Sequence, residues 1–176
     1  MSRKPVGTNA RPTADWFAGV TAMVGGLARA ADSTGIQLSL YNDAPQGQYL
    51  WLWWFTVYND AEGPYRLESF EGAAGTLLTQ GSYVMAGRGA AFGACYYNSI
   101  PIANGDFPAS PSQYPGMGYG GDEAGTNTCY RSPGPTAVLP PGFSFAVDNE
   151  WGGTMIGGAT LAVTFYYSIL PYIPTT

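Results

Sequence analysis

The chain contains no histidine, and this absence removes several classes of function at once. Histidine is the commonest general base, a member of the Ser-His-Asp triad and a frequent metal ligand. Without it, neither Cys95 nor Cys129 can form a Cys-His nucleophile, and two cysteines supply too few ligands for a zinc site. We therefore predict that the protein is not an enzyme and holds no metal or cofactor.

Carboxylates are the remaining candidates for acid–base chemistry. The paired acids are Asp60/Glu62, Glu68/Glu71, Asp122/Glu123 and Asp148/Glu150. A pair can hydrolyse glycosides only when both acids flank a bound sugar, whereas these pairs lie in or beside Gly- and Asn-rich turns. Asp122, Glu123 and Asn127 could offer oxygen ligands to calcium, but they lack the spacing of a calcium-binding loop. We interpret these acids as solvated surface groups.

Charged residues are also scarce, at 11% of the chain, against about 25% in ordinary soluble domains. Aromatic residues reach 15%, and an uncharged, aromatic surface indicates that part of it faces another protein. Residues 1–30 carry four bases against one acid, 4 − 1 = +3, and residues 31–176 carry three against eleven, 3 − 11 = −8. The acidic body argues against nucleic acid as a partner.

No apolar run approaches the roughly 20 residues that cross a bilayer, so we expect no membrane partner. Residues 16–28 are apolar, and Ala28-Arg29-Ala30 is similar to a signal-peptidase site. However, Asp15 directly precedes this run and three glycines dilute it. We therefore predict that the segment is not a signal peptide.

The amino-terminal residues 1–12 are polar and rich in Gly and Pro, which predicts an extended arm. We expect this basic arm to lie on an acidic neighbour, with contacts from Arg3, Lys4, Arg11 and Trp16. The spacing of Trp16, Val20, Met23 and Leu27 then favours a short helix, and a strand around residues 20–24 is the alternative. The domain division is therefore an arm with a short element over 1–30, and a β domain over 31–176.

Alternating apolar residues dominate the rest of the chain. Residues 36–41, 143–148 and 160–169 have the period of two that is typical of strands, and 65–69, 81–85 and 91–97 are further candidates. About eight short strands without βαβ alternation predict an all-β fold, a β-sandwich of the jelly-roll type.

The segment 49–58 is apolar at both odd and even positions. A strand of this kind is covered on both faces, and a two-layer sandwich covers only one. We therefore predict that Trp51, Trp53, Trp54 and Phe55 lie at a subunit contact.

Residues 100–135 lack periodicity and are rich in Gly, Pro, Tyr, Asn and Ser, which predicts one long irregular loop. Its residues Tyr114, Tyr119 and Tyr130 are suited to binding, because tyrosine offers contact area at low entropic cost. A surface excursion that only covers the sheet is the alternative.

Cys95 and Cys129 are separated by 34 positions and belong to no CxxC pair. We favour two free, half-buried thiols, and a disulfide that closes the loop between them is the alternative.

Two stretches of the carboxyl-terminal part, Val138-Leu-Pro-Pro-Gly-Phe-Ser-Phe-Ala-Val147 and Ala159-Thr-Leu-Ala-Val-Thr-Phe-Tyr-Tyr167, resemble the closing strands of small jelly-roll proteins of tailed bacteriophages. Ile36-Gln-Leu-Ser-Leu-Tyr-Asn42 and the aromatic strand after it are similar to their opening strands. The resemblance covers about half the chain. The tryptophan-rich run and the long Tyr/Gly/Pro loop depart from the family pattern.

The resemblance implies a virion protein that is made in the host cytoplasm and joins a phage particle. We expect a capsid decoration (cement) protein, a homotrimer whose partner is the major capsid protein or another virion protein. A neck, tail or fibre component is the alternative within this class. A secreted carbohydrate-binding sandwich, with surface Trp and Tyr stacking on sugar rings, is the alternative of a different class.

Overall fold

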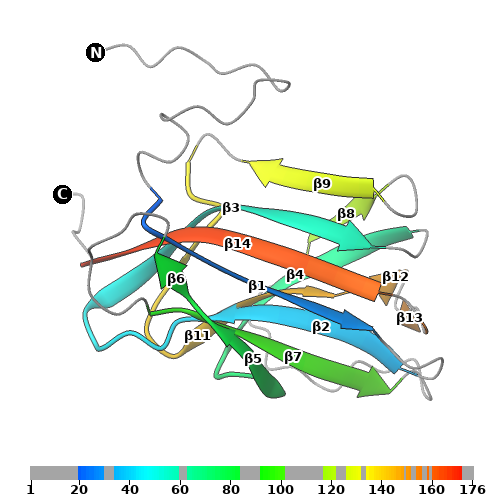
Figure 1. The fold of residues 1–176 in the computed structure, drawn as a ribbon, viewed down its shortest axis with the longest axis horizontal. Helices are drawn as coiled ribbons and strands as arrows, with labels where there is room; N and C mark the ends of the chain where they lie inside the picture. The colour runs from blue at the N-terminus through cyan, green and yellow to red at the C-terminus, as the bar shows by residue number, and fades with distance from the viewer. Residues whose placement is uncertain are drawn as a thin grey trace, which may run out of the picture.

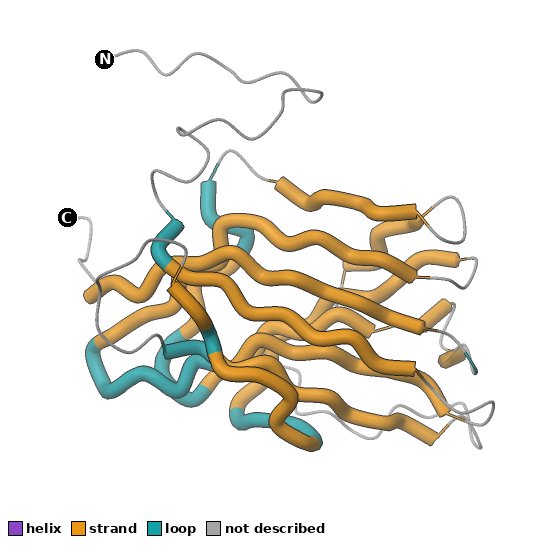
Figure 2. Tube along the Cα trace, viewed as in Figure 1, coloured by secondary structure: helices purple, strands orange, loops and turns teal. Residues whose placement is uncertain are grey.

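The computed structural model describes residues 20–29, 34–59, 63–83, 92–101, 117–121, 126–131, 134–148, 150–151, 154–155, 158 and 160–171. These residues form strands joined by turns, and none of them is helical (Figure 2). All but two of the described strands make two antiparallel sheets that face each other across an apolar core (Figure 1). The predicted all-β fold is therefore confirmed, and its architecture is consistent with a β-sandwich.

The two main sheets are named A and B here, and each has six strands. Sheet A runs in the order β10 (Ala137–Leu139), β3 (Gln48–Asn59), β14 (Thr160–Pro171), β1 (Ala22–Arg29), β6 (Ser82–Tyr83), and β9 (Thr126–Arg131) also pairs with β3. Sheet B runs in the order β5 (Thr76–Gln80), β7 (Ala94–Pro101), β2 (Thr34–Tyr41), β11 (Phe143–Asp148), β4 (Gly63–Glu71), β8 (Met117–Gly121). A separate two-stranded ladder joins β12 (Glu150–Trp151) to β13 (Thr154–Met155).

The core forms because alternating apolar residues of both sheets point at each other. In β14, Leu161, Val163, Phe165 and Tyr167 are fully or almost fully buried, and the residues between them are half-buried. The period of two predicted for 36–41, 143–148 and 160–169 is confirmed by β2, β11 and β14.

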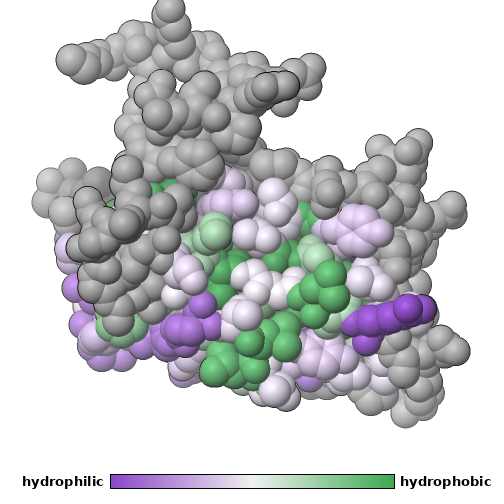
Figure 3. Space-filling view, in the orientation of Figure 1, coloured by the Kyte–Doolittle hydropathy of each residue, from purple (hydrophilic) through white to green (hydrophobic). Residues whose placement is uncertain are grey.

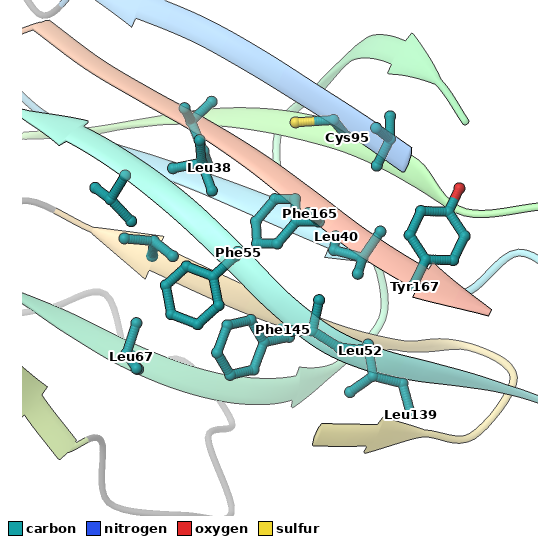
Figure 4. Packing of buried hydrophobic residues seen from close by; sticks show 14 of the residues in the cluster. Leu38, Leu40, Leu52, Phe55, Leu67, Cys95, Leu139, Phe145, Phe165 and Tyr167 are labelled. Atoms are coloured by element: carbon teal, nitrogen blue, oxygen red, sulfur yellow. The ribbon is translucent and has the colours of Figure 1, made fainter. Parts of the chain in front are cut away.

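Three phenylalanines occupy the centre of the core (Figure 4). The ring of Phe55 lies 5.4 Å from that of Phe145 and 6.2 Å from that of Phe165, centroid to centroid, and Phe145 meets Phe165 edge-on at 6.3 Å. Burying a side chain of this size contributes about 1.5–3 kcal/mol to the free energy of unfolding. The two sheets are held together mainly by such contacts.

The first described strand, β1, corrects the helix prediction. It pairs along its whole length with β14, so residues 22–29 belong to sheet A, and the sandwich begins before residue 31. Met23 and Leu27 of the expected helical stripe are 41% and 67% exposed, while Ala22 and Val24 are buried. The strand alternative was the correct element type, because hydrogen bonds to β14 outweigh the low strand propensity of Gly25 and Gly26.

The predicted loop over 100–135 is also corrected. Two strands lie inside it, β8 paired with β4 and β9 paired with β3. Both are outer strands of their sheets, where a Gly-rich sequence such as that of β8 can still form a ladder through its backbone groups. Residues 102–116 lie outside the described residues.

At one corner of the sandwich, the chain passes from sheet B to sheet A between β5 and β6, through Gly81. The hydroxyl group of Tyr167 donates to the carbonyl oxygens of Phe92, at 2.6 Å, and Gly93, at 3.3 Å. Gly93 has φ of +99°, and a Cβ there would lie 2.6 Å from Cζ of Tyr167, so only glycine fits. The Asp43 carboxylate accepts the Gly93 N–H, 2.6 Å away, and completes the corner.

Candidate assembly surface

A β-bulge in β3 explains why segment 49–58 is apolar at both odd and even positions. Tyr166 of β14 pairs with Trp54, but Tyr167 pairs with Leu52, so Trp53 is an extra residue in the ladder. Before the bulge, the even positions Leu50 and Leu52 point into the core, and after it the odd positions Phe55 and Val57 do so. One strand therefore presents four core residues on one face and aromatic residues on the other.

The aromatic residues of β3 form contacts on the outer face of sheet A. The rings of Trp51 and Trp53 lie 6.1 Å apart, and Trp54 stacks on Tyr166 at 5.1 Å with an interplanar angle of 22°. The indole N–H of Trp53 donates to Oγ of Ser168 over 3.0 Å. These contacts fix the large rings, so the aromatic face has a defined shape.

Trp51 and Trp53 are only half-buried, so part of each indole ring is accessible to another protein. The indole nitrogen of Trp51 is itself buried, and no residue that the structure describes accepts a hydrogen bond from it. We name the outer-face residues Tyr49, Trp51, Trp53, Trp54 and Tyr166 the aromatic surface.

The described side chains on the outer face of sheet A are almost all uncharged. Among its described side chains, Arg29 is the one that carries a charge, and it lies at the end of β1. Figure 3 looks onto this face and shows mainly green, white and pale purple colours at its centre, so the hydropathy there ranges from apolar to weakly polar. Water-exposed faces normally carry charged residues, so a face of this composition is suited to contact with another protein.

The four predicted contact residues of β3 do not all reach this surface. Trp51 and Trp53 lie on it half-buried, and Trp54 lies on it but is only 7% exposed. Phe55 is fully buried between the sheets, so the prediction that it belongs to a subunit contact is wrong. The bulge at Trp53 is the reason, because it moves Phe55 to the core face.

Met23 and Leu27 are exposed apolar residues of the same face that the sequence analysis did not identify as contacts. They were assigned to the inner stripe of a helix. In a strand, alternate residues of 22–28 lie on opposite faces, and here one face has small buried residues and the other has large exposed ones. This alternation is the sequence signal that could have identified Met23 and Leu27 as surface residues.

The other predicted contacts are only partly described. Arg3, Lys4, Arg11 and Trp16 of the arm, and Tyr114, lie outside the described residues. Tyr119 lies in β8 opposite Tyr65, and Tyr130 lies in β9 opposite Phe55. Both tyrosines are therefore strand residues, and the prediction that they belong to an irregular loop is wrong.

Cys95 is a free, fully buried thiol on β7. Its Sγ lies under β1, 3.0 Å from where a Cβ on Gly26 would be, whereas Cys129 lies on β9, on the far side of β3 and β14. The structure therefore has the free thiol that we favoured for Cys95, and not the bridge to Cys129, but this thiol is fully buried and not half-buried as predicted. Burial raises the pKa of the Cys95 thiol from 9.0 to about 12.

Two acids that we expected in solvent are buried on the outer face of sheet B. Glu68 is 4% exposed and Asp148 is fully buried. They occupy diagonal positions on neighbouring strands, because Glu68 pairs with Ala146 and Asp148 with Arg66. The side-chain amide of Gln37 donates to the Glu68 carboxylate, which offsets part of the cost of its burial. The interpretation of both acids as solvated is wrong, because strand alternation turns them onto a covered face.

No family model, curated protein or solved structure matches this chain. The described residues contain no group of three or more acids, cysteines or histidines placed to hold a metal ion. None of the described segments is a helix that could cross a bilayer. The functional interpretation therefore rests on the geometry of the sheets and on the sequence resemblance given above.

Proposed function

We propose that this protein is a non-enzymatic structural subunit of a bacteriophage virion, a trimeric capsid decoration protein of jelly-roll fold. The observation that carries the proposal is the outer face of sheet A, on which half-buried tryptophans and exposed apolar residues replace the usual charged side chains. Aromatic residues are enriched and charged residues depleted at the centres of protein interfaces.

The order of the strands supports the jelly roll. Numbered 1 to 8 along the chain, β1, β2, β3, β4, β8, β9, β11 and β14 give the order 1-8-3-6 in sheet A and 2-7-4-5 in sheet B. Two interleaved Greek keys, the arrangement of a double-sheet jelly roll, produce this order. The remaining strands are then additions to the edges and ends of the sheets.

The virion is proposed from the resemblance to phage jelly-roll proteins together with this surface. In a decoration protein, the aromatic surface would join three copies, and the basic residues Arg3, Lys4 and Arg11 would contact the major capsid protein. A subunit that binds only the assembled shell stabilises it by mass action. Cytoplasmic synthesis in the host follows from the same proposal.

The proposal is tested by measuring the mass of the full chain in solution and its binding to undecorated phage shells. We expect a trimer that binds shells, and a Trp53→Arg variant that remains folded but loses the trimer. Arginine removes the indole ring that lies beside Trp51 and donates to Ser168, and it places a charge that must lose its water when the copies meet. The matched control is Gln46→Arg, which adds the same charge in an exposed turn and should change neither property.

A Trp53→Arg protein that keeps both its native circular dichroism and its trimer would refute the role of the aromatic surface. A trimer that binds no shells of any kind, and instead binds a glycan through the same tryptophans, would refute the virion role. It would favour the carbohydrate-binding alternative.

A further inference from the structure

The aromatic surface continues onto the strands on both sides of β3. Val138 of β10 lies opposite Trp51, and Leu170 of β14 lies opposite Tyr49. These two apolar residues are on the same outer face and are 38% and 40% exposed. The apolar surface therefore spans three adjacent strands, and none of these described side chains carries a charge.

The last segment of the chain begins at the rim of this surface. Pro171, the final residue of β14, is exposed and lies opposite Gln48, the first residue of β3 (Figure 1). Residues 172–176 follow it and lie outside the described residues. Since β14 passes Trp51 at Ser168, three residues before its end, the chain leaves the sheet in the direction away from the tryptophans of its own copy.

The composition of this last segment matches that of the aromatic surface. The sequence Leu170-Pro-Tyr-Ile-Pro174 is apolar and contains no charged side chain. Two prolines separated by two residues restrict the backbone and favour the extended polyproline II conformation, so little conformational entropy is lost when such a segment binds. Segments of this kind bind to surfaces lined by aromatic rings. Half-exposed tryptophans on an uncharged face are suited to bind one.

The length of the segment suits a contact between two copies. In the polyproline II conformation, residues 172–176 extend about 15 Å, since each residue advances about 3.1 Å. Neighbouring strands lie about 4.8 Å apart, so the segment can cross about three strands. When copies meet at their aromatic surfaces, Pro171 lies at the edge of the contact, and the segment beyond it can extend over the neighbouring copy.

We propose that residues 171–174 of one copy bind the aromatic surface of the neighbouring copy. The inference rests on the proposed association through that surface and names the segment that the surface binds. In a trimer, each copy gives its segment to the next copy and receives one from the previous copy, so three equivalent contacts close a ring. Each bound segment is tethered at the contact, which raises its effective concentration there.

The first test compares the dissociation of full-chain trimers by sedimentation equilibrium. Ile173→Asp places a carboxylate that must lose its water against an uncharged surface, so we expect it to weaken association about tenfold or more. The matched control is Thr176→Asp, which adds the same charge beyond the second proline and should associate like wild type. Circular dichroism and urea unfolding establish that both variants keep the wild-type fold.

The second test locates the bound segment. A photoreactive phenylalanine analogue replaces Tyr172 in isotope-labelled chains, which are mixed with an excess of unlabelled wild-type chains before illumination. We expect crosslinks that join a labelled chain to an unlabelled one. Mass spectrometry should place them in the peptides of the unlabelled chain that contain Trp51, Trp53 or Val138.

Three results would each overturn the inference. The first is a folded Ile173→Asp protein that associates like wild type, and the second is an equal loss of association in Ile173→Asp and Thr176→Asp. The third is a set of crosslinks that stay within one chain or reach another part of the neighbouring copy.

Failure of this inference can be distinguished from failure of the proposed function. If Trp53→Arg loses the trimer while Ile173→Asp keeps it, the copies associate through the aromatic surface without the last segment, and only the inference is refuted. If Trp53→Arg keeps the trimer, or the wild-type chain is a monomer, the role of the aromatic surface is refuted together with the inference.

Discussion

Replacing Tyr167 by phenylalanine removes a single oxygen atom from the corner where the chain passes between the sheets. Tyr167 is fully buried, and its hydroxyl group is the donor that the structure places 2.6 Å from the carbonyl oxygen of Phe92. The ring itself remains packed in the core, so the substitution creates no cavity. Its effect should therefore come from the lost hydrogen bond.

The expected change in the free energy of unfolding depends on which carbonyl oxygens lose their hydrogen-bond donor. The carbonyl oxygen of Gly93 keeps the N–H of Gly81, 2.7 Å away, and Nε2 of Gln80, 3.3 Å away. The Phe92 carbonyl loses its short bond and is left beside an apolar ring. A buried acceptor without a donor costs about 1–3 kcal/mol, so we expect Tyr167→Phe to lower the free energy of unfolding by about 2 kcal/mol.

The assay is urea unfolding followed by circular dichroism, with thermal unfolding as a second measurement. A loss of about 2 kcal/mol should lower the thermal midpoint by about 4–8 °C in a chain of this length. The matched control is Tyr41→Phe, because the described contact of that half-buried ring is an edge-on ring contact with Tyr96, 5.8 Å away. If Tyr167→Phe and Tyr41→Phe both unfold within about 0.5 kcal/mol of wild type, the corner is not held by this hydroxyl group.

Two further predictions concern the core and the turn after β2. Cys95 should resist alkylation at pH 8 until the protein unfolds, because burial raises its pKa from 9.0 to about 12. The protein should lose stability as pH rises above 9, where the unfolded thiol ionises and the folded one does not, and Cys95→Ser should reduce that pH dependence; rapid alkylation of the folded protein would contradict this. Asn42→Ala should cost about 2–4 kcal/mol in urea unfolding, because the buried Asn42 side chain donates to the carbonyl oxygens of Leu139 and Gln48 and accepts from the N–H of Ala44. A cost below about 1 kcal/mol would mean that water replaces these bonds.

Strands whose one face is apolar could be predicted from the sequence, because side chains in a strand alternate strictly. Residues 160–169 alternate without interruption, and β14 buries the expected residues Leu161, Val163, Phe165 and Tyr167. The same reasoning identified β2 and β11, whose apolar positions pack between the sheets. In these strands, local pattern and tertiary packing agree.

The candidate surface could be predicted only in part, because a bulge is invisible to a period of two. The run 49–58 indicated the right strand and the right tryptophans, but nothing in its composition marks Trp53 as the extra residue. The bulge is set by pairing with β14, in which Tyr167 lies opposite Leu52 and Tyr166 lies opposite Trp54. This pairing joins segments that are far apart in the sequence, so the local sequence does not reveal it. Phe55 was consequently assigned to the wrong face.

Strands that depend on a distant partner were also missed. Residues 117–121 are mostly glycine and carry no apolar alternation, yet they form β8 because β4 supplies a ladder. The burial of Glu68 and Asp148 also depends on distant partners. Both acids lie near turns in the sequence, but pairing of β4 with β11 places them on a buried part of sheet B. Partner strands cannot be identified from local sequence, so these elements could not be found.

The central position of β14 has a consequence for the order in which the molecule can be made. Sheet A needs residues 160–171 between β3 and β1, and Ala22 meets its partner Tyr167 only at that point. During synthesis β1 and β3 therefore leave the ribosome long before the strand that separates them exists. Their unpaired edges must stay apart from other chains until residues 160–171 have been made, so this sheet cannot close before then and the nascent chain is exposed to aggregation.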